Sequence, residues 1–169
     1  MSTKDKNLIE STSTVHTTAV FSKDATRRYL LSMSWDDKKK KVCIIMTYPS
    51  TADSLIIDQT TMLCRNNAVE QDYGSISIVN LFCTLDTDKP DSDRMNASIL
   101  AEECDKADLV IIAYGRGTAH TEEKDSLLTA LKAYKNKLYT IVDSSGQPFS
   151  HPLSPRARSW KVIKLDKSQ

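Results

Sequence analysis

Short apolar runs alternate along the chain with longer stretches of mixed polarity. Residues 42–47 (VCIIMT) and 108–114 (DLVIIAY) are almost continuously apolar, which is the pattern of strands buried on both faces of a parallel sheet. Residues 75–82 and 138–142 predict two further core strands, and residues 19–21 and 28–35 predict two strands ahead of them. Residues 160–165 predict a last edge strand or a short extension.

Helical segments are predicted between the core strands. Residues 58–72 place apolar side chains on one face, and Asp58 can cap the first turn through its carboxylate. A second helix is predicted over about residues 94–106. A third helix is expected to begin at a cap on Thr121, because Glu122 and Glu123 then lie in the first turn, where carboxylates interact favourably with the helix dipole.

This order of elements predicts a three-layer α/β/α sandwich around a mainly parallel central sheet. Residues 1–17 are rich in Ser, Thr and Lys without hydrophobic periodicity, so they are expected to form a flexible arm or a poorly fixed first strand. Residues 18–169 are expected to form a single α/β domain, since the chain has only 169 residues.

Charge narrows the classes of function. Lys and Arg number 23 and Asp and Glu number 22, a net charge of +1, whereas a domain that coats nucleic acid is usually far more basic. The charges are unevenly spread, with eight acidic and three basic side chains in residues 86–108, and five basic and one acidic in residues 151–169. A phosphate-bearing ligand is therefore compatible with the C-terminal part of the chain, while extensive binding of duplex nucleic acid is not indicated.

Several common sites and segments are not indicated by the sequence. The chain has four glycines, and neither G-x-G-x-x-G nor G-x-x-x-x-G-K-[ST] occurs, so any phosphate is expected to be held by side chains. The four cysteines include no close pair of the kind that zinc sites use, and no metal or cofactor is expected. The first residues show no apolar signal region, and no apolar run approaches the roughly 20 residues of a membrane helix. A cytoplasmic protein that does not engage a membrane is the expectation.

Polar side chains follow the predicted core strands, at the carboxyl edge where open α/β sheets bind ligands. Two of them suit a catalytic role. Asp53 could hold a water or cap its own turn, and His151 could donate to a developing anion or be an ordinary loop histidine. The candidate ligand-binding residues are Tyr48, Pro49 and Ser50 after the first core strand, Asn80 on the second, Tyr114 and Arg116 after the third, and Arg156 beyond His151.

A series of short motifs, taken in order, resembles the uncharacterised bacterial and phage proteins grouped as domain of unknown function 1643. The resemblance runs from about residue 27 to residue 153. The motifs are Arg28-Tyr-Leu-Leu-Ser, Trp35-Asp36, Pro49-Ser-Thr-Ala-Asp53, Asp58-x-Thr60, Val79-Asn-Leu-Phe82, Tyr114-Gly115 and Gly146-x-Pro-x-x-His151-Pro-Leu153.

The layout is also distantly similar to the uracil-DNA glycosylase superfamily. In that superfamily a proline loop positions water and base, a strand asparagine reads the base, and a late His-Pro loop stabilises the departing base. The similarity implies a glycosylase-like fold and assigns these roles to Pro49, Asn80 and His151-Pro152. Tyr48 departs from both patterns, which carry Asn or Asp there, and a phenol with a pKa of about 10 cannot act as a carboxylate base at pH 7.

Three hypotheses follow from these observations. The first is a domain that recognises a nucleobase or nucleotide in a glycosylase-like pocket, with or without hydrolysis of an N-glycosidic bond in DNA or in a free nucleotide. The second is a non-catalytic phage or bacterial protein that binds and sequesters a small nucleotide-like signalling ligand. The third is a protein-interaction module that retains a pocket without using it.

Overall fold

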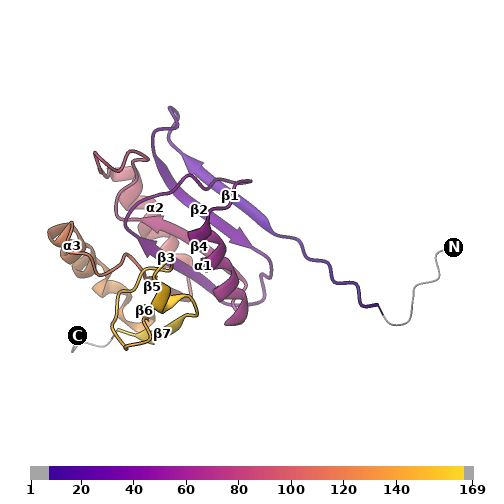
Figure 1. Cartoon of the computed structure of the whole chain (residues 1–169). Coiled ribbons are helices and arrows are strands. Elements are labelled where there is room, and N and C mark those ends of the chain that lie inside the picture. The colour runs from indigo at the N-terminus through magenta and orange to yellow at the C-terminus, as the bar shows by residue number, and fades with distance from the viewer. Residues whose placement is uncertain (1–7, 166–169) are drawn as a thin grey trace.

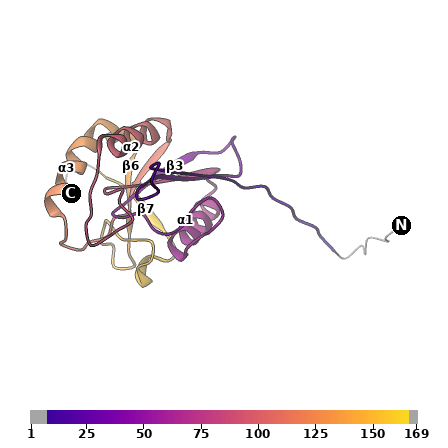
Figure 2. The ribbon, with the colours of Figure 1, turned by 90° about the horizontal axis from the view of Figure 1, so that it is seen from above.

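The computed structural model describes residues 8–165 and shows one mixed sheet with helices on both of its faces (Figures 1 and 2). The sheet has seven strands in the order β1-β2-β4-β3-β5-β6-β7. The strands are β1 (His16–Phe21), β2 (Arg28–Ser34), β3 (Lys41–Met46), β4 (Ser75–Asn80), β5 (Leu109–Ile112), β6 (Leu138–Val142) and β7 (Lys161–Lys164). All seven lie in or overlap the segments predicted as strands, including the edge strand near the C-terminus.

The pairing of these strands differs from the expected one. The four central strands pair in parallel, β4 with β3, β3 with β5, and β5 with β6. The other three pairs, β1 with β2, β2 with β4, and β6 with β7, are antiparallel. The prediction of a mainly parallel sheet is therefore wrong, because parallel neighbours need a long crossover, and no helix connects β1 to β2 or lies between β2 and β3.

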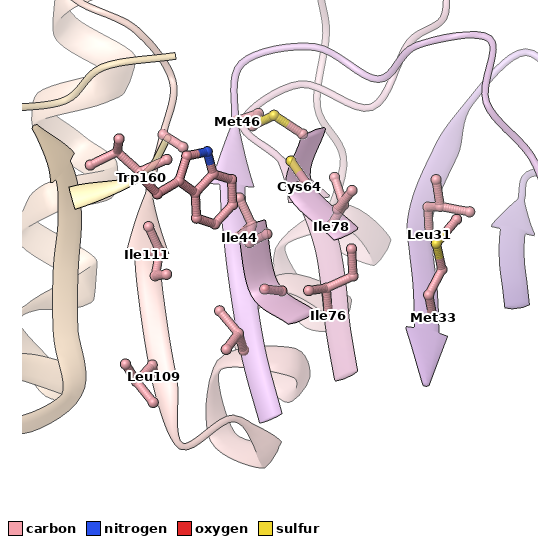
Figure 3. Packing of buried hydrophobic residues seen from close by; sticks show 14 of the residues in the cluster. Leu31, Met33, Ile44, Met46, Cys64, Ile76, Ile78, Leu109, Ile111 and Trp160 are labelled. Carbon is pink, nitrogen blue, oxygen red and sulfur yellow. The ribbon is translucent and has the colours of Figure 1, made fainter. Parts of the chain in front are cut away.

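The helices divide between the two faces of the sheet (Figure 2). One face packs against α1 (Gln59–Glu70), which contributes Cys64 and Ala68 to the buried cluster there. Figure 3 shows this cluster, in which the Trp160 side chain lies beside Ile44 and Ile111 of the sheet. The opposite face packs against α2 (Arg94–Lys106) and α3 (Thr121–Leu131).

Acidic side chains set the beginning of two helices. An oxygen of Asp58 accepts from the Thr61 amide at 2.7 Å, which confirms the predicted cap of α1, and Asp93 caps α2 in the same way. The predicted third helix is present as α3, with Glu122 and Glu123 in its first turn, but the predicted cap on Thr121 is wrong. Its N-cap is His120, in the left-handed region at φ 59°, and Thr121 uses its hydroxyl to donate to the Thr118 carbonyl instead.

The N-terminal part of the described chain leads away from the domain (Figures 1 and 2). Residues 8–15 carry no helix or strand, and β1 begins at His16, within the segment 1–17 expected as an arm. Residues 1–7 of that arm, like residues 166–169, lie outside the described part. No helix within residues 8–165 has the length and apolar character needed to cross a lipid bilayer.

The topology marks one place on the carboxyl edge of the sheet. From β3 the chain passes over one face, through α1, to β4 on one side of β3. From β4 it passes over the other face, through α2, to β5 on the opposite side of β3. The loops that leave β3 and β5 therefore diverge to opposite faces. Such a switch point leaves a crevice where open α/β sheets bind ligands.

Candidate functional site

The loop after β3, residues 47–58, forms one wall of this crevice, and a buried arginine holds it in place. Arg28 lies at the start of β2, which runs antiparallel to β4 and so begins at the same edge. Its side chain is 1% exposed, and its Nη1 donates to the carbonyls of Ser50 (3.2 Å) and Ala52 (2.7 Å). Burial lowers the pKa of the guanidinium to about 10, and the charge of Asp58 opposes that shift.

Asp58 joins this loop to the first turn of α1. Burial favours a higher pKa for the Asp58 carboxyl, but hydrogen bonds from Ser50 and Thr61 and the charge of Arg28 outweigh it and lower the pKa. The Ser50 hydroxyl therefore faces a carboxylate directly, without an intervening imidazole. This is not the arrangement of a serine nucleophile, in which a histidine takes the hydroxyl proton.

His151 reaches the crevice from the loop after β6. Its Nδ1 accepts a hydrogen bond from the Leu153 amide at 3.1 Å, so the neutral ring carries its proton on Nε2. Burial lowers the pKa of His151, and the charge of Asp58 only partly opposes this. The half-buried ring is thus a neutral hydrogen-bond donor at pH 7.

Gly115, which follows β5, allows the His151 loop to approach closely. Its φ is 84°, a left-handed conformation that favours glycine, and an added Cβ would lie 3.5 Å from the Cβ of His151. The Thr47 hydroxyl donates to the Tyr114 carbonyl at 2.9 Å and ties the loops after β3 and β5 together. The loops after β3, β5 and β6, which carry Ser50, Gly115 and His151, therefore meet at this edge of the sheet.

Tyr48 belongs to an aromatic cluster beside the crevice. Its ring stacks on Phe82 with centroids 5.7 Å apart, and its hydroxyl hydrogen-bonds Nε2 of His120 at 2.5 Å. The Asn80 side chain, 1% exposed, donates to the Tyr48 carbonyl at 2.7 Å. Asn80 therefore fixes the start of the loop after β3 through one of its two amide hydrogens.

Asp53 shapes the far part of the same loop. One of its carboxylate oxygens accepts from the amides of Leu55 and Ile56, both at 2.7 Å, and these bonds lower its pKa. Asp53 therefore caps its own turn, which is one of the two roles that the sequence left open for it. A cavity of about 580 Å³ lies on this side of the loop, and its lining is Phe21, Pro49, Ser50, Thr51, Asp53, Leu85 and Thr87.

Three other candidates have different surroundings. Tyr114 is 8% exposed and stacks on Phe149 within the core under α3. Arg116 forms an ion pair with the fully buried carboxylate of Asp143 at 2.7 Å. Arg156 is exposed and lines a cavity of about 460 Å³ beside β7.

Two residues that the sequence did not single out as site residues hydrogen-bond to candidate site residues in the structure. Arg28 hydrogen-bonds Ser50, and His120 hydrogen-bonds Tyr48. The partners in each pair are far apart in the chain, so no local sequence pattern could reveal them. Two signals in the sequence pointed to Arg28, its place in the first family motif and its charge at the start of a predicted strand. Within residues 8–165, no group of three or more His, Cys, Asp or Glu side chains is arranged to hold a metal ion.

The comparisons with known proteins place the chain in a family. No curated protein and no solved structure matches it. A family model described as a protein of unknown function (DUF1643) matches residues 28–153, from the arginine that holds the loop after β3 to the loop of His151. The chain therefore belongs to the DUF1643 family.

Proposed function

We propose that the crevice above β3 and β5 binds a nucleobase or a nucleotide-like small molecule, with His151 donating a hydrogen bond to an acceptor on the base. The observation that carries this proposal is the Leu153 amide bonded to Nδ1 at 3.1 Å, which directs the ring proton to Nε2. Carbonyl and ring-nitrogen acceptors are common on nucleobases. A donor fixed in advance loses little freedom on binding.

The likeness to the uracil-DNA glycosylases remains part of this proposal and rests on the chain order of three residues. Pro49, Asn80 and His151 lie at the carboxyl edge, on or just after β3, β4 and β6 in chain order. The part proposed for Asn80 is positional, since one of its two amide hydrogens holds the Tyr48 carbonyl.

Binding without hydrolysis is the version that the contacts favour. Hydrolysis of an N-glycosidic bond needs a group that orients or activates water. The carboxylates of Asp53 and Asp58 both accept hydrogen bonds from their own loop or helix. The Tyr48 hydroxyl is bonded to His120. A protein that binds and sequesters a nucleotide-like ligand fits these contacts better than a hydrolase.

Calorimetric titration with a panel of free nucleosides and nucleotides tests the proposal. We expect one ligand to bind the wild type and His151→Ala to weaken it by about tenfold, the loss of one hydrogen bond. His16→Ala is the matched control, because His16 is exposed and pairs with Ser34 at the opposite edge of the sheet. Equal affinity in the wild type and the His151 variant, or no binding at all, would contradict the proposal.

Chromatography of the same mixtures tests hydrolysis separately. We expect the ligand to be recovered intact. Release of a free base would show that the protein hydrolyses the ligand as a glycosidase and does not merely sequester it. Uracil-containing single-stranded and duplex DNA belong in the panel for the same reason.

A further inference from the structure

The cavity of about 460 Å³ beside β7 has an unusual concentration of positive charge. Arg156, Arg158 and Lys161 line it, together with Ser144, Gly146 and Ser159. The 3-10 turn η2 (Pro155–Ala157) and the start of β7 bring the three cations together. The chain contains no Asp or Glu from residue 144 to residue 165.

Among the residues that the structure describes, no carboxylate compensates the charge of these three cations, unlike that of several other cations in the protein. Arg27, Lys39 and Lys106 each form an ion pair shorter than 3 Å. Within residues 8–165, the side chains of Arg156, Arg158 and Lys161 form no ion pair or hydrogen bond. Like charges held together without compensation attract an anion.

One acidic residue lines the cavity, and its charge is already compensated. The Asp143 carboxylate is fully buried, receives hydrogen bonds from Ser145 and Gln147, and pairs with Arg116 at 2.7 Å. The field in the cavity is therefore set by the arginines and the lysine. Two hydroxyl side chains, Ser144 and Ser159, add neutral donors.

The cavity adjoins the proposed base-binding crevice through a single loop. The Ser154 amide donates to the His151 carbonyl, and the Ala157 amide donates to the Ser154 carbonyl, so two successive turns connect His151 to η2. The Arg156 carbonyl accepts from the Ser144 amide, which fixes this loop against the end of β6. His151 and the cations of the cavity therefore belong to one continuous segment of chain that these backbone bonds hold in place.

We propose that this cavity is an anion site that receives the phosphate groups of the ligand, held by Arg156, Arg158 and Lys161. The identity of that ligand as a nucleotide rests on the proposed function. Guanidinium groups match phosphate oxygens in pairs, and hydroxyl donors complete the oxygen coordination. No glycine-rich loop is needed, because side chains supply the contacts.

Calorimetry with inorganic tripolyphosphate tests the site without any base. We expect the wild type to bind it and the double variant Arg156→Gln/Arg158→Gln to bind at least about tenfold more weakly. Lys23→Gln/Lys89→Gln removes the same charge from exposed positions outside the cavity and is expected to leave the affinity unchanged. His151→Ala is also expected to retain tripolyphosphate binding.

Two results would overturn the site: no tripolyphosphate binding by the wild type, or equal weakening in the two double variants. Comparing the affinities for a nucleoside and for its triphosphate then tests whether one ligand occupies both the crevice and the anion site. The triphosphate is expected to bind more tightly in the wild type and to lose that advantage in the arginine variant. Loss of nucleoside binding in His151→Ala concerns the crevice alone, so failure of one proposal can be distinguished from failure of the other.

Discussion

Replacement of Asn80 by aspartate tests whether the Asn80 side chain holds the loop after β3. Asn80 is 1% exposed, and its amide donates to the Tyr48 carbonyl at 2.7 Å. An ionised carboxylate cannot donate and would face that carbonyl oxygen inside the protein. A protonated carboxyl can donate in place of the amide. We therefore expect the folded form of Asn80→Asp to keep the new carboxyl protonated.

The pH dependence of the free energy of unfolding follows from this requirement. The new carboxyl has its pKa raised by burial in the folded state and has a pKa of about 3.9 when unfolded. Holding the proton costs about 4.2 kcal/mol at pH 7 and about 1.5 kcal/mol at pH 5, at 1.36 kcal/mol per pH unit. The folded state binds the extra proton, so stability is gained as the pH falls. The variant is expected to recover about 2.7 kcal/mol relative to the wild type between these two pH values.

Urea unfolding of both proteins at pH 5 and pH 7 measures this difference. Asn66→Asp is the control, because Asn66 is exposed on α1 and its variant should show little change with pH. The same destabilisation of Asn80→Asp at both pH values would refute the reasoning, since it would mean that the carboxyl ionises freely and that the bond to Tyr48 is unimportant.

Three further predictions concern the supports of the site. Arg28→Met leaves the carbonyls of Ser50 and Ala52 without a donor, so urea unfolding should show a loss of roughly 1–3 kcal/mol; an unchanged midpoint would contradict this. Trp160→Ala removes a side chain that is 8% exposed and packs on the sheet, and the same assay should show a loss of about 3–5 kcal/mol. Because burial lowers the pKa of His151 in the folded state, protonation favours the unfolded chain. Wild-type stability should therefore fall as the pH drops below about 6.5, and His151→Asn should weaken that dependence in thermal unfolding at pH 5 and 7.

The sequence predicted those parts of the fold that depend on local pattern. The apolar runs that became β3 and β5 and the cap at Asp58 are features of neighbouring residues. The direction in which strands pair does not depend on local pattern. The antiparallel alignment of β2 with β4 depends on contacts between residues more than 40 positions apart, such as Leu31 with Ile78.

The candidate site shows the same division. Placing His151 at the carboxyl edge needed only the order of the elements. The capping of the Asp53 turn was one of two local alternatives. The partners that decide what each side chain can do, such as Asp143 for Arg116, come from distant segments that only the fold brings together. The sequence thus predicts which polar residues lie at the carboxyl edge of the sheet, but it does not predict their hydrogen-bond partners.

The separation of the acidic and basic segments along the sheet has a consequence for the rate of ligand capture. The loop of Asp86, Asp88 and Asp91 lies toward the β1–β2 end, where Asp91 pairs with Arg27, and Arg156, Arg158 and Lys161 lie beside β7 at the opposite end. Uncompensated positive charge is therefore concentrated beside β7, although the net charge of the chain is only +1. An approaching anion is turned toward β7 before it makes contact, so its association rate should fall as salt is added.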